Sequence, residues 1–442
     1  MLKKGDPKLI RAWTFYDWAN SVYPLVITSA IFPSYYDAIT STKDAVTGEI
    51  LSDKVSAFGG IFPNEDIYSY VYAFALFLVV LSAPILSGIA DYVGNKKRFL
   101  QFFCFLGSIS CMCLFFFSKE HIEWSFIPFI TATIGFWGSL VFYNSYLPEI
   151  ASPENQDKVS AKGFARGYFG SSLLLIICLV CIIVFKMPAK YSFLLVGIWW
   201  MGFAQITFFA LPTLSHKAHG ENKGLFTKGF KELFVVFKDV LTRKTLRRFL
   251  GSYFFYNMGL QTILVMAVLF ARKEIQWGKP GQSHLEVEAI KTNSLIISIL
   301  LIQFLGIAGA YIFSWLSRKI GNIKALGTSI FIWIFVCIFT YSVAHYPIHF
   351  YIVAASVGLV MGGAQSLSRS TYSKYLPETD DNASYFSFYD VMEKLGMIIG
   401  TVSFGLIGQM TGGMRNSILV LIAFFVIGFL LLLRVPKSNT VH

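Results

Sequence analysis

FYDWANS, residues 15–21, opens the first long apolar run of the chain and places a carboxylate and an amide inside it. At helical pitch Asp17, Asn20 and Pro24 lie roughly on one face, because residues three or four apart fall one above the other. An ionised carboxylate facing lipid is very unfavourable, so this face is expected to look into protein or water. A related pattern, FYNMGLQ, returns at residues 255–261. The sequence therefore predicts two membrane-embedded halves, each opened by a polar-faced helix.

The composition supports a membrane protein. Of the 442 residues, 55% are hydrophobic and only 14% are charged, and the mean hydropathy is +0.59. A soluble domain carries about 25% charged residues. The net charge of +12 is expected to follow the positive-inside rule, because no aromatic-and-basic module accompanies it and nucleic acid is not an expected partner.

The spacing of the apolar runs predicts an all-α polytopic fold with twelve transmembrane helices. Each run is near the ~20 residues that a helix needs to cross the hydrocarbon core, and continuous runs favour a helical bundle over a barrel. The predicted spans are 13–39, 67–92, 98–118, 124–150, 162–185, 191–213, 248–274, 289–316, 325–344, 349–376, 385–410 and 416–434.

An even number of spans places both termini on one side. Basic residues concentrate in the alternate loops that contain residues 96–98, 158–162 and 318–324, so that side is predicted to be cytoplasmic. The expected location is an inner (cytoplasmic) or plasma membrane.

The chain is predicted to have three parts. Residues 1–213 form an N-terminal six-helix bundle, residues 214–247 a cytoplasmic linker, and residues 248–442 a C-terminal six-helix bundle. Apolar residues recur at helical spacing in the linker, with basic residues between them, so an amphipathic helix on the inner membrane surface is expected. It serves either as a brace or as a partner- or lipid-sensing element.

The two predicted bundles repeat one another. YLPE ends both the fourth and the tenth span, at residues 146–149 and 375–378, an offset of 229 residues. Asp17 and Asn257 are 240 residues apart. Such internal symmetry is typical of transporter folds whose halves rock about a central site.

Residues 82–98 read SAPILSGIADYVGNKKR and resemble the signature loop of the major facilitator superfamily. That pattern is glycine, three residues, Asp, a basic residue, any residue, Gly and further basic residues. Here Ser87 stands at the first glycine position and Tyr92 replaces the basic residue. Gly94 permits a tight turn, and Asp91 is predicted to cap or pair with a neighbouring helix end as part of a gate.

A finer resemblance is to the vacuolar amino-acid effluxer-like family within that superfamily. It rests on YDWANS at 16–21, on Asn144 with LPE at 147–149, on GGAQSLSRS at 362–370 and on FSFYDVMEK at 386–394. The resemblance implies a twelve-helix facilitator of two pseudo-symmetric halves. The fungal branch of the family is associated with amino-acid export from the vacuole.

Asp17 is the first candidate for a coupling group, because a carboxyl group inside the membrane can exchange a proton. The alternative is a permanent ion pair with Arg166 or Lys394. Asn20 is expected either to line a cavity or to hydrogen-bond between helices.

Further amides are candidates for solute binding. Asn257 and Gln261 lie four residues apart on one helix face, and amides can donate to a carboxylate and accept from an ammonium group. Asn144 and Gln365 join them. Each could instead hold helices together.

Arg369 shares a helix face with Gln365. It either clamps a substrate carboxylate or forms an inner gate with Glu149, Glu378 or Asp390.

Asp390, Glu393 and Lys394 form a charged group on the eleventh predicted span. Asp390 and Lys394 either neutralise one another at i,i+4 spacing, or the carboxylates serve as alternating partners for Arg166.

Together these features predict a secondary transporter, not an enzyme, that moves a small polar solute by alternating access. An amino acid or related metabolite is the leading substrate class, export is favoured, and a proton is the expected coupling ion, with sodium left open. No metal, cofactor or phosphate-binding loop is predicted; membrane lipids are expected partners. The rival interpretations are a non-transporting receptor or scaffold, a membrane enzyme, and an exporter of drugs or lipids.

Overall fold

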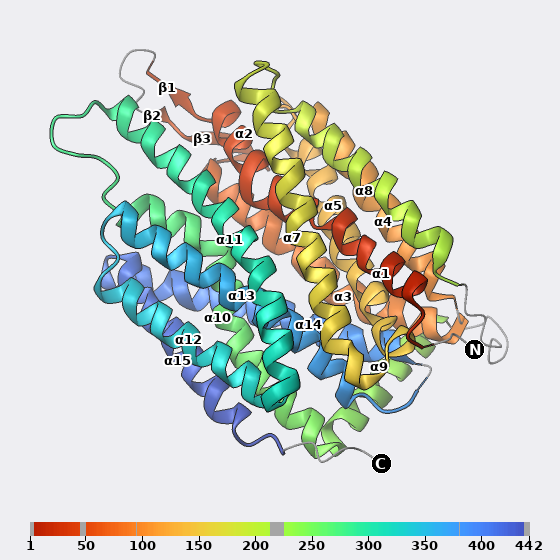
Figure 1. Cartoon of the computed structure of the whole chain (residues 1–442). Coiled ribbons are helices and arrows are strands. Elements are labelled where there is room, and N and C mark those ends of the chain that lie inside the picture. Colours follow the sequence, from red (N-terminus) through yellow and green to blue (C-terminus); the bar gives the residue numbers. More distant parts are fainter. Residues whose placement is uncertain (1–3, 45–49, 94, 213–224, 380, 437–442) are drawn as a thin grey trace.

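The computed structural model describes residues 4–436, except residues 45–49, 94, 213–224 and 380. The predicted turn at Gly94 and residues 214–224 of the predicted linker therefore lie outside the described part. The long helices run side by side in a single bundle (Figure 1). In the described part, eleven helices are long and apolar enough to cross a membrane.

The elements of the N-terminal half are, in order, α1 (Pro7–Asn20), η1 (Tyr23–Ala30), α2 (Ile31–Thr40), β1 (Thr42–Lys43), β2 (Ile50–Ser52), β3 (Lys54–Ala57), β4 (Gly60–Pro63), α3 (Asn64–Val93), α4 (Lys96–Cys113), η2 (Leu114–Phe116), α5 (Ile122–Ser145), α6 (Leu147–Ile150), α7 (Pro153–Ile183) and α8 (Tyr191–Ala210).

The linker helix and the C-terminal half follow as α9 (Leu225–Thr242), α10 (Lys244–Glu274), α11 (His284–Ile320), α12 (Asn322–Ser342), α13 (Pro347–Tyr375), α14 (Asn382–Thr411) and α15 (Met414–Leu432).

The first predicted span, 13–39, is not one regular helix. It consists of α1, the π-helical stretch η1 and α2. Pro24 has no backbone N–H to donate, so it interrupts the regular helical hydrogen bonds. A π-helical stretch such as η1 widens the helix locally. The hydroxyl groups of Thr28 and Ser29 both donate to the Pro24 carbonyl at 2.7 Å. Counted as one crossing, this run and the eleven long helices give twelve.

Residues 40–66, between the first two predicted spans, contain two short antiparallel pairs of strands, β1–β2 and β3–β4. Strands of two to four residues are too short to show an alternating pattern, so the sequence did not predict them. The backbone N–H of Phe58 donates to the Glu123 carboxylate at 2.9 Å and ties the second hairpin to α5.

Two hydrophobic cores form, one drawn almost wholly from residues 13–211 and the other from residues 236–435. Between the halves, α7 lies against α11 and α13, and α3 lies against α14. Within the C-terminal half α11 and α13 approach very closely: a Cβ atom at Gly309 would overlap the Leu359 carbonyl.

The predicted amphipathic helix forms as α9 and packs against α3 and α14. Val236 and Val240 are buried, while Phe234 on the same helix is exposed. The Asp239 carboxylate accepts hydrogen bonds from the Tyr385 hydroxyl at 2.6 Å and from the Arg243 guanidinium at 2.5 Å. The Arg243 bond lowers the pKa of Asp239, so the contact is present at neutral pH and is lost only as pH falls through that lowered pKa.

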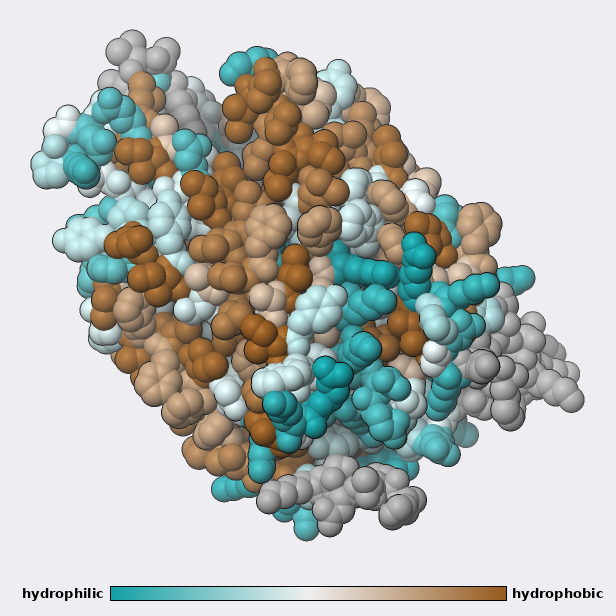
Figure 2. Space-filling view, in the orientation of Figure 1, coloured by the Kyte–Doolittle hydropathy of each residue, from teal (hydrophilic) through white to brown (hydrophobic). Residues whose placement is uncertain are grey.

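Both ends of the described chain lie at the α9 end of the bundle. The N–H of Gly5 donates to the Ile150 carbonyl, and Arg248 donates to the Arg434 carbonyl, each at 2.8 Å. Figure 2 shows apolar side chains over most of one face, with hydrophilic ones gathered near this end and near the hairpins at the other.

Candidate functional site

A cavity of about 1380 Å³ lies between the two halves. Its inner end is lined by Asp17 and Arg369, and its mouth by residues near the hairpins, such as Ile50, Glu65 and His284. The cavity therefore opens at the end opposite α9. Its floor is formed by side chains from both halves.

Asp17 and Arg369 form a buried ion pair across this floor. A guanidinium nitrogen lies 3.3 Å from the Asp17 carboxylate, and the two residues are 5% and 3% exposed. The Tyr143 hydroxyl donates to the same carboxylate oxygen at 2.7 Å. The pair joins α1 to α13, and thus the N-terminal half to the C-terminal half.

Further bonds hold the guanidinium in place. Arg369 donates through Nε to the Ser160 hydroxyl at 2.9 Å, through Nη2 to the Ser160 carbonyl at 3.0 Å, and through Nη1 to the Asn144 amide oxygen at 3.3 Å. Its guanidinium carbon lies 4.2 Å from the centroid of the Phe164 ring. Such contacts with ring faces and fixed acceptors stabilise a buried cation.

The Asp17–Arg369 ion pair lies directly against Gly163, where there is no room for a side chain. A Cβ atom at Gly163 would overlap the Asp17 carboxylate and would come within 3.0 Å of Arg369 Nη2. We expect Gly163→Ala to separate the pair and to destabilise the protein by about 1–3 kcal/mol, the usual cost of overpacking. The measurement is thermal unfolding of the purified protein together with solute flux in vesicles.

Gly202→Ala in α8 is the matched control for that substitution, because its added methyl group would meet no atom within 4 Å. Equal stability and flux for the two alanine variants would show that the pair tolerates displacement.

A second charged cluster lines the cavity on the C-terminal side. On α14, Lys394 forms an ion pair with Asp390 and lies 3.5 Å from Glu393. The Lys394 ammonium also lies 3.6 Å from the centroid of the Trp137 ring on α5. Gln261 on α10 donates to Glu393 at 2.6 Å. This cluster also crosses between the halves, through the lysine and the tryptophan.

Four residues that line the cavity have a buried polar atom without a hydrogen bond in the described part of the chain. The donors are the amide nitrogen of Asn20 and the indole nitrogen of Trp137, and the acceptors are the amide oxygen of Gln303 and one carboxylate oxygen of Asp390. Asn20 and Asp390 are nearly fully buried, at 1% and 4% exposed. Unsatisfied buried groups are costly, so a bound solute that supplied partners would be favoured here.

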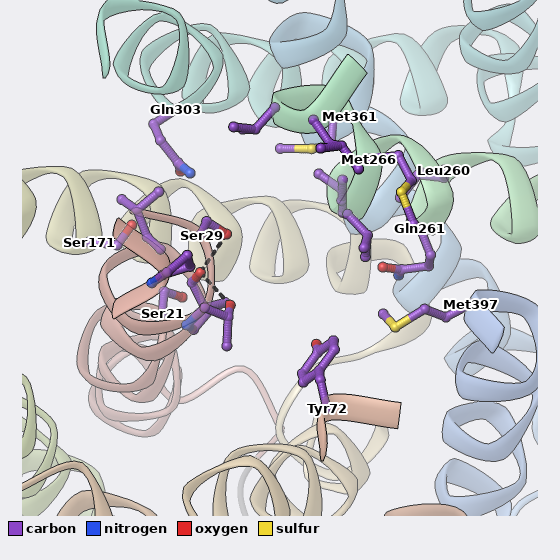
Figure 3. A pocket seen from close by; sticks show the side chains of 18 of the residues that line it. Ser21, Ser29, Tyr72, Ser171, Leu260, Gln261, Met266, Gln303, Met361 and Met397 are labelled. Atoms are coloured by element: carbon purple, nitrogen blue, oxygen red, sulfur yellow. Dashed lines mark hydrogen bonds between the residues drawn. The ribbon is translucent and has the colours of Figure 1, made fainter. Parts of the chain in front are cut away.

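The cavity wall is mixed in chemistry. Figure 3 shows Ser21, Ser29 and Ser171 on one side, and Leu260, Gln261, Met266, Met361 and Met397 on the other, with Tyr72 pointing between them. The wall therefore offers hydroxyl groups from both halves and thioether groups from the C-terminal half.

Below the cavity, at the α9 end, two carboxylates tie the halves together. Asp91 on α3 accepts from the backbone N–H and the hydroxyl of Ser384, both at 2.7 Å, at the start of α14. Asp157 on α7 accepts from Ser317 at 2.9 Å and from Lys374 at 2.7 Å. In both contacts the carboxylate belongs to the N-terminal half and the serine hydroxyl to the C-terminal half.

A family model described as "Vacuole effluxer Atg22 like" matches residues 5–441. The chain belongs to this family.

Relatives of this Atg22-like protein span almost its whole length. An uncharacterised MFS-type transporter, YxiO of Bacillus subtilis, is 29% identical over 99% of this chain and 97% of its own. Autophagy-related protein 22-1 of Penicillium rubens is 22% identical over 97% and 90%.

Solved structures identify the fold as that of the major facilitator superfamily. The transporter FucP in its outward conformation aligns with a TM-score of 0.68 at 12% identity, over 98% of this chain and 99% of its own. The proton:xylose symporter XylE aligns with a TM-score of 0.65 at 14% identity, over 98% and 96%. The Atg22-like chain therefore has the fold of this superfamily, and its long apolar helices make it an integral membrane protein.

The structure brings most of the predicted site residues to the cavity. Its lining contains Asp17, Asn20, Asn144, Asn257, Gln261, Gln365, Arg369, Asp390 and Glu393, and Lys394 lies directly behind. Gln365 accepts from the Tyr168 hydroxyl at 2.6 Å, and Asn257 donates to the Glu393 carbonyl at 3.3 Å. Asp91 makes the helix-end contact predicted for it. The roles in binding and gating stay predictions.

Several predicted partnerships are wrong. Arg166 pairs neither with Asp17 nor with Asp390; it donates to the Arg11 carbonyl and the Thr14 hydroxyl on the outer side of α1. The partner of Asp17 is Arg369, and Arg369 pairs with none of the three carboxylates considered for it. Glu149 instead forms an ion pair with Lys96 and accepts from Asn382 at 3.0 Å.

Sequence reasoning missed Tyr143, Ser160, Asp157 and Trp137. Tyr143 precedes Asn144, which belongs to one of the family motifs, so the sequence indicated this region although not Tyr143 itself. Asp157 lay in a predicted loop. The one pattern that could have pointed to it is its offset of 227 residues from Ser384, which is close to the offset of 229 residues between the repeated YLPE motifs. Nothing in the sequence singled out Ser160.

Proposed function

We propose that this protein carries a small polar solute, an amino acid or related metabolite, out of the cytoplasm by alternating access coupled to protons. The proposal rests chiefly on the buried Asp17–Arg369 ion pair, which closes the inner end of a large cavity that is open at the other end. The effluxer description of the family supports a transport function, whereas the direction out of the cytoplasm is our own proposal.

The proposed orientation places α9 and both termini in the cytoplasm of an inner or plasma membrane. The cavity then faces outward. Residues 1–213 and 248–442 are proposed to move as two bodies joined by the linker, since each has its own core. Opening to the cytoplasm requires the ion pair and the Asp91 and Asp157 contacts to separate.

The charges in the cavity suit a zwitterion and a proton. Three carboxylates, those of Asp17, Asp390 and Glu393, face two basic side chains, Arg369 and Lys394. One negative charge is therefore unmatched and can be balanced by an ammonium group or by a proton. Competition of the two for the same carboxylates is what solute–proton exchange requires.

Asp17 is the proposed coupling group. While it is ionised, its attraction to Arg369 holds the inner end shut, and the empty carrier cannot return without a proton. A proton arriving from the open side neutralises Asp17. The attraction between Asp17 and Arg369 is then weaker, and the two halves can separate at the inner end. After the inner end opens and the proton leaves, a solute carboxylate can engage Arg369.

The test is a solute screen with the purified full-length protein. Amino acids, dipeptides, sugars and nucleosides are compared by thermal shift, and each hit is tested for counterflow and for solute-driven proton movement in reconstituted vesicles. We expect amino acids to stabilise the protein, by about 2.7 kcal/mol at a hundred times the dissociation constant.

Flux of a sugar or nucleoside alone would contradict the substrate class. Flux of an amino acid without proton movement would contradict the coupling. Binding without any flux would favour a receptor.

A further inference from the structure

A stripe of outward-facing residues runs along helix α7. Its outward-facing positions follow one another at intervals of three or four residues, which keeps them on one face of the helix. The members of this α7 stripe are Lys158, Lys162, Arg166, Phe169, Leu173, Ile177 and Val180. The first three are basic and the last four are apolar, so the chemistry changes once along the helix.

The basic end of the stripe is joined by α1. Arg11 is exposed there, and Arg166 reaches across to donate to the Arg11 carbonyl at 2.9 Å. The charges that act on Lys162 are those of Arg166, Lys158 and Arg11, all positive. These four side chains form a basic cluster at the α9 end of the bundle.

No carboxylate in the described part of the chain pairs with this cluster. Glu154 stands one turn before Lys158 on α7, but the two form no ion pair there, and Asp157 points the other way to bind Lys374. Four like charges held together without a counter-charge repel one another, so an anion bound among them would be stabilising.

The apolar end of the stripe continues toward the hairpin end of the bundle. Phe169 is 48% exposed, Ile177 39% and Val180 42%. Figure 2 shows the hydrophilic patch over the lower part of α7 and α1, with apolar side chains above it along α7. A ligand that matched both ends would carry an anionic head and a long apolar tail.

We propose that the α7 stripe is a binding site for an anionic phospholipid. The phosphate of the lipid lies among Arg11, Lys158, Lys162 and Arg166, and one acyl chain follows Phe169, Leu173 and Ile177. Ordinary basic residues at the cytoplasmic interface would attract anionic lipid without a fixed site. Here three of the four basic residues lie on the same face of α7 as the apolar residues. Helix α7 packs against α1 and α13, the helices that carry Asp17 and Arg369.

The test measures lipid binding to the full-length protein in detergent by native mass spectrometry. The probes are dioleoyl phosphatidylglycerol, dioleoyl phosphatidylcholine and free glycerol phosphate. We expect the phosphatidylglycerol to bind most tightly. Lys158→Gln/Lys162→Gln should weaken its binding about 25-fold, since each basic charge near an anionic lipid contributes about fivefold.

The matched control is Arg318→Gln/Lys319→Gln, which removes two exposed basic charges from the same end of the other half. Its binding should stay within about twofold of the unmodified protein, and both double variants should keep their thermal midpoints, since none of the four substituted residues is buried.

Three results would overturn the proposal. Equal binding of the two lipids would remove the requirement for an anionic head. An equal loss in the control would show general attraction by basic residues. Binding of glycerol phosphate as tight as that of the whole lipid would show an anion site without an acyl track.

Discussion

Asp17→Asn is expected to abolish accumulation of the solute driven by a proton gradient, while counterflow exchange of the solute continues. Asparagine keeps the size of the side chain and can still accept from Tyr143, but it cannot bind and release a proton. The carrier then behaves as though Asp17 were permanently protonated, so its return step no longer waits for a proton. The measurement is solute accumulation and counterflow in the same reconstituted vesicles.

Glu65→Gln is the matched control, because Glu65 also lines the cavity but lies exposed at its mouth. It should leave both activities intact. Undiminished gradient-driven accumulation by Asp17→Asn would exclude Asp17 as the coupling group. Loss of counterflow as well would point to a purely structural pair.

Arg369→Ala is expected to have the largest effect on stability. It would leave the Asp17 carboxylate buried without its counter-charge, a change that typically costs about 3–5 kcal/mol. The lower thermal midpoint should be accompanied by loss of solute binding and flux. By comparison, Arg318→Ala removes an exposed arginine and should change stability by less than about 0.5 kcal/mol.

The double variant Asp17→Asn/Arg369→Gln separates charge from packing. It removes both charges and keeps two amides that can hydrogen-bond, so it should recover most of the stability that Arg369→Ala loses, although not proton coupling. If the double variant is no more stable than Arg369→Ala, the two charges do not depend on one another.

The sequence was sufficient to predict the helical bundle and the inward face of several polar residues. Long apolar runs predicted the helices, and the YLPE repeat predicted two similar halves. An inward orientation of Asp17 could be predicted because an ionised carboxylate is very unfavourable in lipid. The spacing of Asn257 and Gln261 predicted that they share a helix face.

The partners could not be predicted in the same way. Asp17 and Arg369 are 352 residues apart, and they meet because α7 packs against both α1 and α13. Arg166 was predicted as a partner for Asp17 or for the carboxylates of α14. It points outward because its neighbours Gly163 and Gly167 occupy the inward face, in contact with Asp17 and Ser21.

Other features were missed for local reasons. The break in the first span depends on Pro24 and on the hydroxyl groups that bond to its carbonyl. The spacing of apolar residues, from which the span was predicted, contains no information about either feature. Asp157 resembled a solvated loop residue, although helix α7 begins at Pro153 and turns that carboxylate toward Ser317.

The central claim is that the Asp17–Arg369 ion pair holds the inner ends of the two halves together. Its most direct test is the distance, by pulsed electron paramagnetic resonance, between spin labels at exposed Asn155 in α7 and exposed Lys324 in α12. Loss of about 3 kcal/mol of attraction shifts a two-state equilibrium by more than about a hundredfold. We predict a single short distance in the otherwise unmodified protein and in Glu65→Gln, and a dominant longer distance in Asp17→Asn; identical distances in all three would contradict the account.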